Sequence, residues 1–245
     1  MNGLITVYRR ELAGLFVAPL AWILLTVSFG LTGWLFVAML ENSGGDITYA
    51  NRFTGGLSGV YWALMMFLPP LLTMRMISEE SRNGLLEFLL TSPVTDAAVV
   101  LGKFFAAWTF MALFWSNNLI YAATVHGLGT PPDWPPVLGG YMGSVLVSGL
   151  FCAVGLFASS IFSSPILSAF AAMCGSIVML MLPRLVGVYD SDWLTEQFVA
   201  VDIMRNFQTT FLVGLFDTQV LVFFLAWTGF FLFLATRGVE AKRWK

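Results

Sequence analysis

Apolar runs long enough to cross a membrane recur along the chain and restrict it to one class of fold. Hydrophobic residues make up 58% of the 245 residues, and charged residues make up only 11%. A water-soluble domain of this size cannot cover so much apolar surface, whereas a helix of about 20 apolar residues spans a bilayer. The sequence therefore predicts an all-α, polytopic membrane protein.

We expect a single transmembrane domain, 1–245, with about six transmembrane helices. The predicted spans are 20–40, 56–76, 98–125, 137–162, 165–182 and 220–236. Residues 1–18 form a predicted interfacial helix, because their apolar side chains repeat at helical spacing while arginines fill the other side. Residues 188–218 are too polar to span but keep a helical rhythm, which predicts external amphipathic helices before the last span.

Positive charges concentrate on one side of the predicted membrane. With both termini inside, the inner side holds Arg9, Arg10, Arg75, Arg82, Lys103, Arg237, Lys242, Arg243 and Lys245. The outer side holds Arg52, Arg184 and Arg205. Cytoplasmic loops of membrane proteins carry an excess of lysine and arginine. We therefore expect both termini in the cytoplasm.

A short charged stretch interrupts the apolar sequence between the second and third predicted spans. Within it, Gly84 and Pro93 bound a segment that can form about two helical turns, 84–92. Its apolar face would consist of Leu85, Phe88 and Leu89, with Leu86 and Leu90 beside them. Two turns of helix are not stable alone in water, so this face needs a partner surface.

This stretch resembles the cytoplasmic coupling loop of ABC type-2 exporter permeases. The matching residues are Met74-Arg75, Glu79-Glu80, Gly84, Leu85-Leu86-Glu87-Phe88-Leu89-Leu90, Thr91-Ser92-Pro93 and Gly102-Lys103. One residue departs from the pattern, since Leu85 stands where the family usually has threonine. Within the family, the stretch is most similar to the gliding-motility-associated permease group.

The resemblance implies a non-catalytic permease subunit of an ATP-driven ABC exporter in the bacterial cytoplasmic (inner) membrane. It implies a dimer, homomeric or heteromeric, that encloses a translocation path. It also implies that the coupling helix docks on separate ABC ATPase subunits, which hold the ATP and Mg. The docking residues would be Leu85, Leu86, Glu87, Phe88 and Leu89. The resemblance does not decide whether an auxiliary membrane or periplasmic subunit joins the complex. We expect membrane lipid around the chain and no nucleic-acid partner.

Further polar and small residues receive roles from their positions. Four charged residues lie beside the coupling segment: Arg75, Glu79, Glu80 and Arg82. We expect them to orient the loop against Arg9 and Arg10. Asn117 and Asn118 fall inside the third predicted span, where amides serve either helix packing or a transport path. Small residues at i, i+4 spacing predict a close helix contact at Gly140, Ser144 and Ser148.

The chain shows no strong signature of its own catalysis. Gly102-Lys103 is followed by Phe104 and lacks the upstream glycine of a phosphate-binding loop, so we expect no ATP hydrolysis here. Ser58 lies in a Gly-x-Ser-Gly run that resembles the nucleophile motif of rhomboid intramembrane proteases. The only histidine, His126, is not inside a later helix as that motif requires.

An intramembrane serine protease and a non-transporting membrane scaffold are nevertheless the two alternatives to a permease. The methionines have no cysteine or histidine at ligand spacing, so we expect no metal site and no cofactor in this chain.

Overall fold

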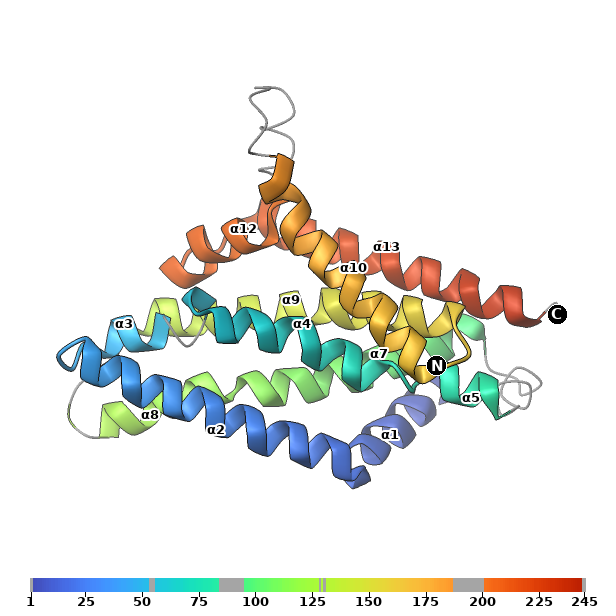
Figure 1. Ribbon diagram of the computed structural model, residues 1–245, viewed down its shortest axis with the longest axis horizontal. Coiled ribbons are helices and arrows are strands. Elements are labelled where there is room, and N and C mark those ends of the chain that lie inside the picture. Colours follow the sequence, from blue (N-terminus) through green and yellow to red (C-terminus); the bar gives the residue numbers. More distant parts are fainter. Residues whose placement is uncertain are drawn as a thin grey trace.

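The computed structural model describes residues 2–52, 56–83, 95–127, 129, 131–186 and 201–243. Within these ranges the regular elements are helices, and none is a strand (Figure 1). Six helical stretches there are long and apolar enough to cross a membrane: Pro19–Asn42, Gly59–Arg82, Asp96–Gly127, Trp134–Ile161, Pro165–Arg184 and Thr218–Lys242. The predicted all-α fold with about six spans is confirmed, and the chain is a multi-pass membrane protein.

The first two helices meet at a bend. Helix α1 (Asn2–Val17) is followed by the extended backbone of Ala18, and Pro19 then opens α2 (Pro19–Asn42). Proline suits the first helical position because its missing N–H would have no partner there. Figure 1 shows α1 leaving the end of α2 at an angle. A short helix, α3 (Ile47–Arg52), follows at the other end of α2.

The second span consists of a helix, a turn and a short helix. Helix α4 (Gly59–Thr73) begins at Ser58, whose hydroxyl oxygen accepts a hydrogen bond from the Tyr61 N–H at 3.1 Å. It contains Pro69 and Pro70, which withhold two backbone donors from its last turns. A turn over 74–77 then leads into α5 (Ser78–Arg82).

The third span is interrupted, although the sequence predicts one helix over 98–125. Helix α7 (Asp96–Trp115) ends before Ser116, and α8 (Asn117–Gly127) continues the span. The Ser116 hydroxyl donates a hydrogen bond to the Leu113 carbonyl at 2.6 Å. Serine and asparagine side chains compete for backbone hydrogen bonds in this way, and such competition favours a helix break at this position.

Helix α9 (Trp134–Ile161) is the central element of the bundle. It packs against α4, α7, α10 (Pro165–Val186) and α13 (Thr218–Arg243), and it is the most buried of the spans. The last helix, α13, continues beyond the predicted end at 236 to Arg243.

The described part of the predicted external segment is helical. It contains α12 (Ile203–Thr209) and one 3₁₀ turn, η2 (Phe211–Val213), while residues 187–200 lie outside the described ranges. Phe207 and Phe211 are fully buried in this segment. They join an aromatic core in which the Tyr61 ring lies 4.8 Å from Trp115 and 5.4 Å from Phe207 between centroids. The segment is therefore anchored to the bundle by its aromatic face.

Candidate functional site

Four charged side chains from three helices form a closed ring at one end of the bundle. Arg10 Nη2 lies 2.6 Å from Glu11 Oε1 and 2.8 Å from Glu80 Oε1. Lys103 Nζ lies 2.9 Å from Glu11 Oε1 and 2.9 Å from Glu80 Oε2. We call these four residues the ion cluster. It joins α1, α5 and α7, and its charges alternate and cancel.

A close approach between α1 and α7 makes this ring possible. A Cβ atom on Gly102 would lie 2.9 Å from the Val7 side chain and 3.2 Å from the Leu4 carbonyl oxygen. A larger residue would therefore push α1 away from α7. The next residue, Lys103, is fully buried and reaches Glu11 across this contact. Gly102 thus lets α1 approach α7 closely, and Lys103 on α7 then forms an ion pair with Glu11 on α1.

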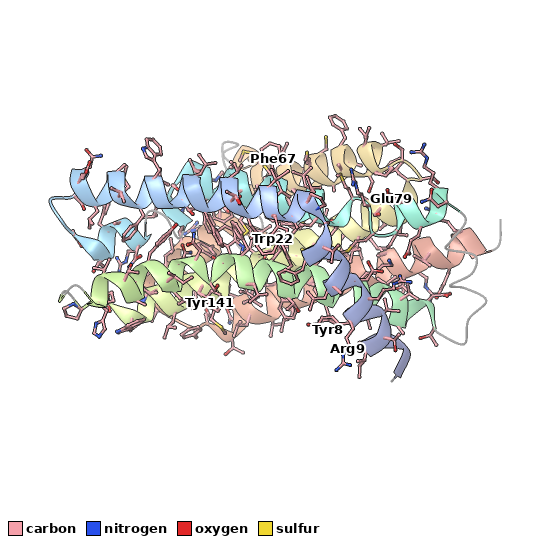
Figure 2. All side chains as sticks on the ribbon, turned by 90° about the horizontal axis from the view of Figure 1, so that it is seen from below. Tyr8, Arg9, Trp22, Phe67, Glu79 and Tyr141 are labelled. Atoms are coloured by element: carbon pink, nitrogen blue, oxygen red, sulfur yellow. The ribbon has the colours of Figure 1, made fainter. Side chains whose placement is uncertain are left out.

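Tyr8 adds a polar contact farther along the same crossing. Its hydroxyl lies 3.3 Å from the Thr109 hydroxyl of α7. Figure 2 shows Tyr8 and Arg9 on α1, where this helix crosses the bundle, and Glu79 on α5.

The turn between α4 and α5 is fixed to the end of α9 by one serine. The Ser159 hydroxyl accepts hydrogen bonds from the backbone N–H groups of Ile77 at 3.1 Å and Ser78 at 2.9 Å. It donates a hydrogen bond to the Met74 carbonyl at 3.1 Å. All polar groups of this hydroxyl are used, and the start of α5 is therefore held firmly in the position that presents Glu80 to Lys103.

The electrostatics of the ion cluster favour ionised partners. Burial by itself raises the pKa of Glu11, but attraction to Lys103 and hydrogen bonds from Arg10 and Lys103 outweigh it, so the pKa lies below its usual value. Burial lowers the pKa of Arg10, yet the two carboxylates raise it above its usual value. Both shifts favour the ionised forms of Arg10 and Glu11, the two residues that α1 contributes to the cluster.

The predicted loop-orienting charges divide into two groups. Glu80 belongs to the ion cluster and pairs with Arg10, which is the partner the sequence suggests. Arg75, Glu79 and Arg82 are exposed, and so is Arg9. Only one of the two glutamates therefore meets the N-terminal helix.

The predicted coupling helix, 84–92, lies outside the described residues, and so do its residues Leu85, Leu86, Glu87, Phe88 and Leu89. Its flanks are described on both sides. Helix α5 ends at Arg82, and α7 begins at Asp96 after Thr95, whose hydroxyl accepts a hydrogen bond from the Ala98 N–H. Glu80 and Lys103 thus tie the two flanks of the segment to each other.

The two asparagines of the third span occupy buried positions at the start of α8. Asn117 Nδ2 donates a hydrogen bond to Thr32 Oγ1 of α2 at 2.8 Å. Asn118 lies beside a small hollow that Arg52 and Asp133 also line. Asn117 therefore contributes to packing between α2 and α8.

The predicted contact residues of α9 are buried, but some glycines elsewhere on the helix approach their neighbours more closely. Ser144 bonds the Tyr61 hydroxyl at 2.7 Å, and Ser148 bonds the Val145 carbonyl. A Cβ atom on Gly140 would meet Leu212 at an ordinary 3.5 Å. Cβ atoms on Gly139 and Gly143 would instead clash with η2 and α12.

Ser58 and His126 have structural contacts of their own. The Ser58 hydroxyl oxygen caps α4, as described above, and its side chain is buried. The His126 ring packs edge-on against Trp134 with centroids 5.9 Å apart. Among the described residues, no group of three or more His, Cys, Asp or Glu could hold a metal ion.

Sequence reasoning did not assign Glu11, Lys103 and Ser159 to this site. A lysine inside a long apolar helix is a usable signal, because a charge there needs a buried partner. Nothing comparable marks Ser159, since serines are frequent in α9.

A comparison with protein-family models matches residues 40–189, more than half of the chain, to a family described as ABC-2 family transporter protein. The matched range contains α4, α5, α7 and α9, and hence Glu80, Lys103 and Ser159. A comparison with curated proteins found no match.

Proposed function

The chain belongs to the ABC-2 family of transporter proteins, and we propose that it is the non-catalytic permease subunit of an ATP-driven exporter. In this proposal two permease chains, identical or related, pair to enclose a translocation path. Separate ATPase subunits bind ATP and Mg and dock on the coupling helix, 84–92. Membership of the gliding-motility-associated group stays a prediction from the loop residues.

The ion cluster is the observation that carries this proposal. A coupling helix transmits motion only if both of its flanks are attached to rigid elements. Glu80 on one flank and Lys103 on the other are 2.9 Å apart and share Glu11 and Arg10 as partners. A displacement of the segment between them would therefore move α5, α7 and α1 together.

The turn before α5 extends this path toward the centre of the bundle. Ser159 holds the turn against the end of α9, the helix on which most of the other spans pack. Packed elements with two discrete arrangements can carry such motion, whereas loosely held ones absorb it. We propose that ATP-driven approach of the ATPases shifts the ion cluster and the end of α9 as one unit.

We further propose that the ion cluster faces the cytoplasm of a bacterial cell, with the chain in the inner membrane. The excess of arginine and lysine at this end supports the assignment. A Cβ atom on Gly238 near the C-terminus would lie 2.3 Å from Ser160 Oγ, beside the residue that holds the turn before α5. Both termini and the ion cluster therefore lie at the same end of the bundle (Figure 1).

Phe88→Ala tests the docking role. Burial of such a side chain contributes about 1.5–3 kcal/mol, so its loss should weaken ATPase binding by roughly 10- to 100-fold. The tagged chain is purified from its own cells, and the affinity and stoichiometry of the co-purifying ATPase are compared with wild type.

The matched control is Phe67→Ala, which removes an exposed phenylalanine within α4. It should leave ATPase binding unchanged, because Phe67 lies within a span and away from the loop. If Phe88→Ala binds the ATPase with wild-type affinity and stoichiometry, residues 84–92 do not dock on the ATPase. That result would contradict the proposed function.

A further inference from the structure

A cavity of about 390 Å³ lies beside the ion cluster, between α1, α2, α4 and α5. Its walls are mainly apolar, with Leu15, Leu71 and Met76 among them. Its volume falls within the range of sites for small ligands, about 300–1,000 Å³. The cavity lies where the apolar span α2 begins, and we expect lipid chains to meet their headgroups at this level.

Small residues at the bend between α1 and α2 create this space. Gly14, Ala18 and Ala21 all line the cavity. A Cβ atom on Gly14 would meet nothing within 4 Å apart from its chain neighbours and the backbone of its own helix. The protein therefore leaves room here that a side chain at position 14 could fill.

The charges that face the cavity are of two kinds. Glu11 and Glu80 are neutralised within the ion cluster. Arg75 and Glu79 are exposed, and among the described residues neither side chain forms an ion pair. They lie one helical turn apart, since the Glu79 N–H donates to the Arg75 carbonyl at 3.3 Å. The rim thus presents one positive and one negative charge side by side.

We propose that this cavity binds a zwitterionic phospholipid whose headgroup carries a phosphate and a primary ammonium. The Arg75 guanidinium binds the phosphate, for which its planar fork of donors is suited. The Glu79 carboxylate binds the ammonium. The first part of an acyl chain packs against the apolar wall, while the rest stays in the bilayer. A purely anionic headgroup would satisfy Arg75 but would place its charge near Glu79.

This site does not depend on the proposed coupling function, because it concerns lipid binding by the chain itself. Its test therefore measures lipid retention rather than ATPase activity. Purified protein is titrated in detergent with phosphatidylethanolamine or phosphatidylglycerol of identical acyl chains, and bound lipid is counted by native mass spectrometry.

Wild type should bind phosphatidylethanolamine about fivefold more tightly than phosphatidylglycerol, as expected for one partly exposed charge contact of about 1 kcal/mol. Glu79→Gln should abolish this preference, and Arg75→Gln should weaken binding of both lipids. Arg82→Gln is the charge control, because Arg82 is exposed on α5 but does not line the cavity. It should bind both lipids as wild type does.

Gly14→Leu and Gly14→Ala form the second matched pair. Leucine should fill the space and reduce phosphatidylethanolamine binding at least fivefold, whereas alanine should leave it unchanged. Equal affinity of wild type for the two lipids, or a preference for phosphatidylglycerol, would overturn the proposal. Retained binding in a folded Gly14→Leu variant would do the same.

Discussion

Lys103 is the residue on which the ion cluster depends most. Its side chain is fully buried, whereas that of Arg10 is 50% exposed. Water and neighbouring ions can partly replace an exposed charge, but nothing replaces a buried one. The two cations of the cluster should therefore contribute very different amounts to stability.

We predict that Lys103→Met lowers the free energy of unfolding by about 3–5 kcal/mol, because it leaves two largely buried carboxylates with Arg10 as their remaining cluster cation. Arg10→Met should cost only about 0–1 kcal/mol. Equilibrium unfolding of both variants in detergent at pH 7 provides the comparison.

The unfolding comparison is made at pH 7 because the contribution of Glu11 to stability depends on pH. Because the pKa of Glu11 is lowered in the folded protein, its contribution is present above its usual pKa of 4.5 and is lost as pH falls below that value. At pH 7 the cluster is intact. Equal losses of stability in Lys103→Met and Arg10→Met would contradict the assignment of Lys103 as the central charge.

Helix α9 organises the bundle through positions that lack a side chain. A Cβ atom on Gly139 would lie 2.1 Å from the Phe211 carbonyl oxygen, and one on Gly143 would lie 2.7 Å from Phe207 and Phe211. Close approach of a backbone oxygen leaves no room for a methyl group. The contact between α9 and the segment of α12 and η2 therefore requires glycine at these positions.

We predict that Gly139→Ala destabilises the protein by about 1–3 kcal/mol, the usual cost of overpacking. Gly140→Ala is its control, because a Cβ atom there meets Leu212 at an ordinary 3.5 Å. Alanine is about 1 kcal/mol better than glycine in a helix interior, so Gly140→Ala should be neutral or stabilising. Both changes are read from unfolding in detergent. Similar effects at the two positions would mean that Phe211 does not approach α9 as closely as described.

The molecule as a whole exposes apolar residues on its outermost spans. Large exposed hydrophobic side chains occur on α2, α10 and α13, among them Trp34, Phe170 and Phe233. The centre of the bundle is filled by α4, α7 and α9, whose spans are more than half buried. The outer helices therefore present the apolar surface that a membrane protein needs toward lipid.

We predict that single cysteines at Asn83 and Lys245 are shielded from an impermeant thiol reagent in intact cells, whereas cysteines at Asp133 and Asp192 react. The background variant carries Cys174→Ser, because Cys174 is exposed while Cys152 is buried. Labelling in permeabilised cells checks that the shielded sites are reactive. Labelling of Asn83→Cys from outside would reverse the proposed orientation.

Local features of the sequence account for much of the fold. The six spans follow from apolar runs, and several helix starts follow from single residues such as Pro19, Ser58 and Thr95. These signals act over one or two helical turns, so they can be read without knowing what the helix packs against. The break at Ser116 does not show in the apolar pattern, because that pattern continues on both sides of it.

The tertiary structure, and not the local sequence, decides the ion cluster and the close contacts of α9. Glu11 and Lys103 are 92 residues apart in sequence, and their meeting requires the approach of α1 to α7 at Gly102. The pattern of small residues on α9 suggests a contact face at Gly140, but closer approaches occur at other glycines of the helix, among them Gly139 and Gly143. The rotation of a helix about its axis is set by the side chains of its neighbours, here Phe207 and Phe211, and no spacing within α9 contains that information.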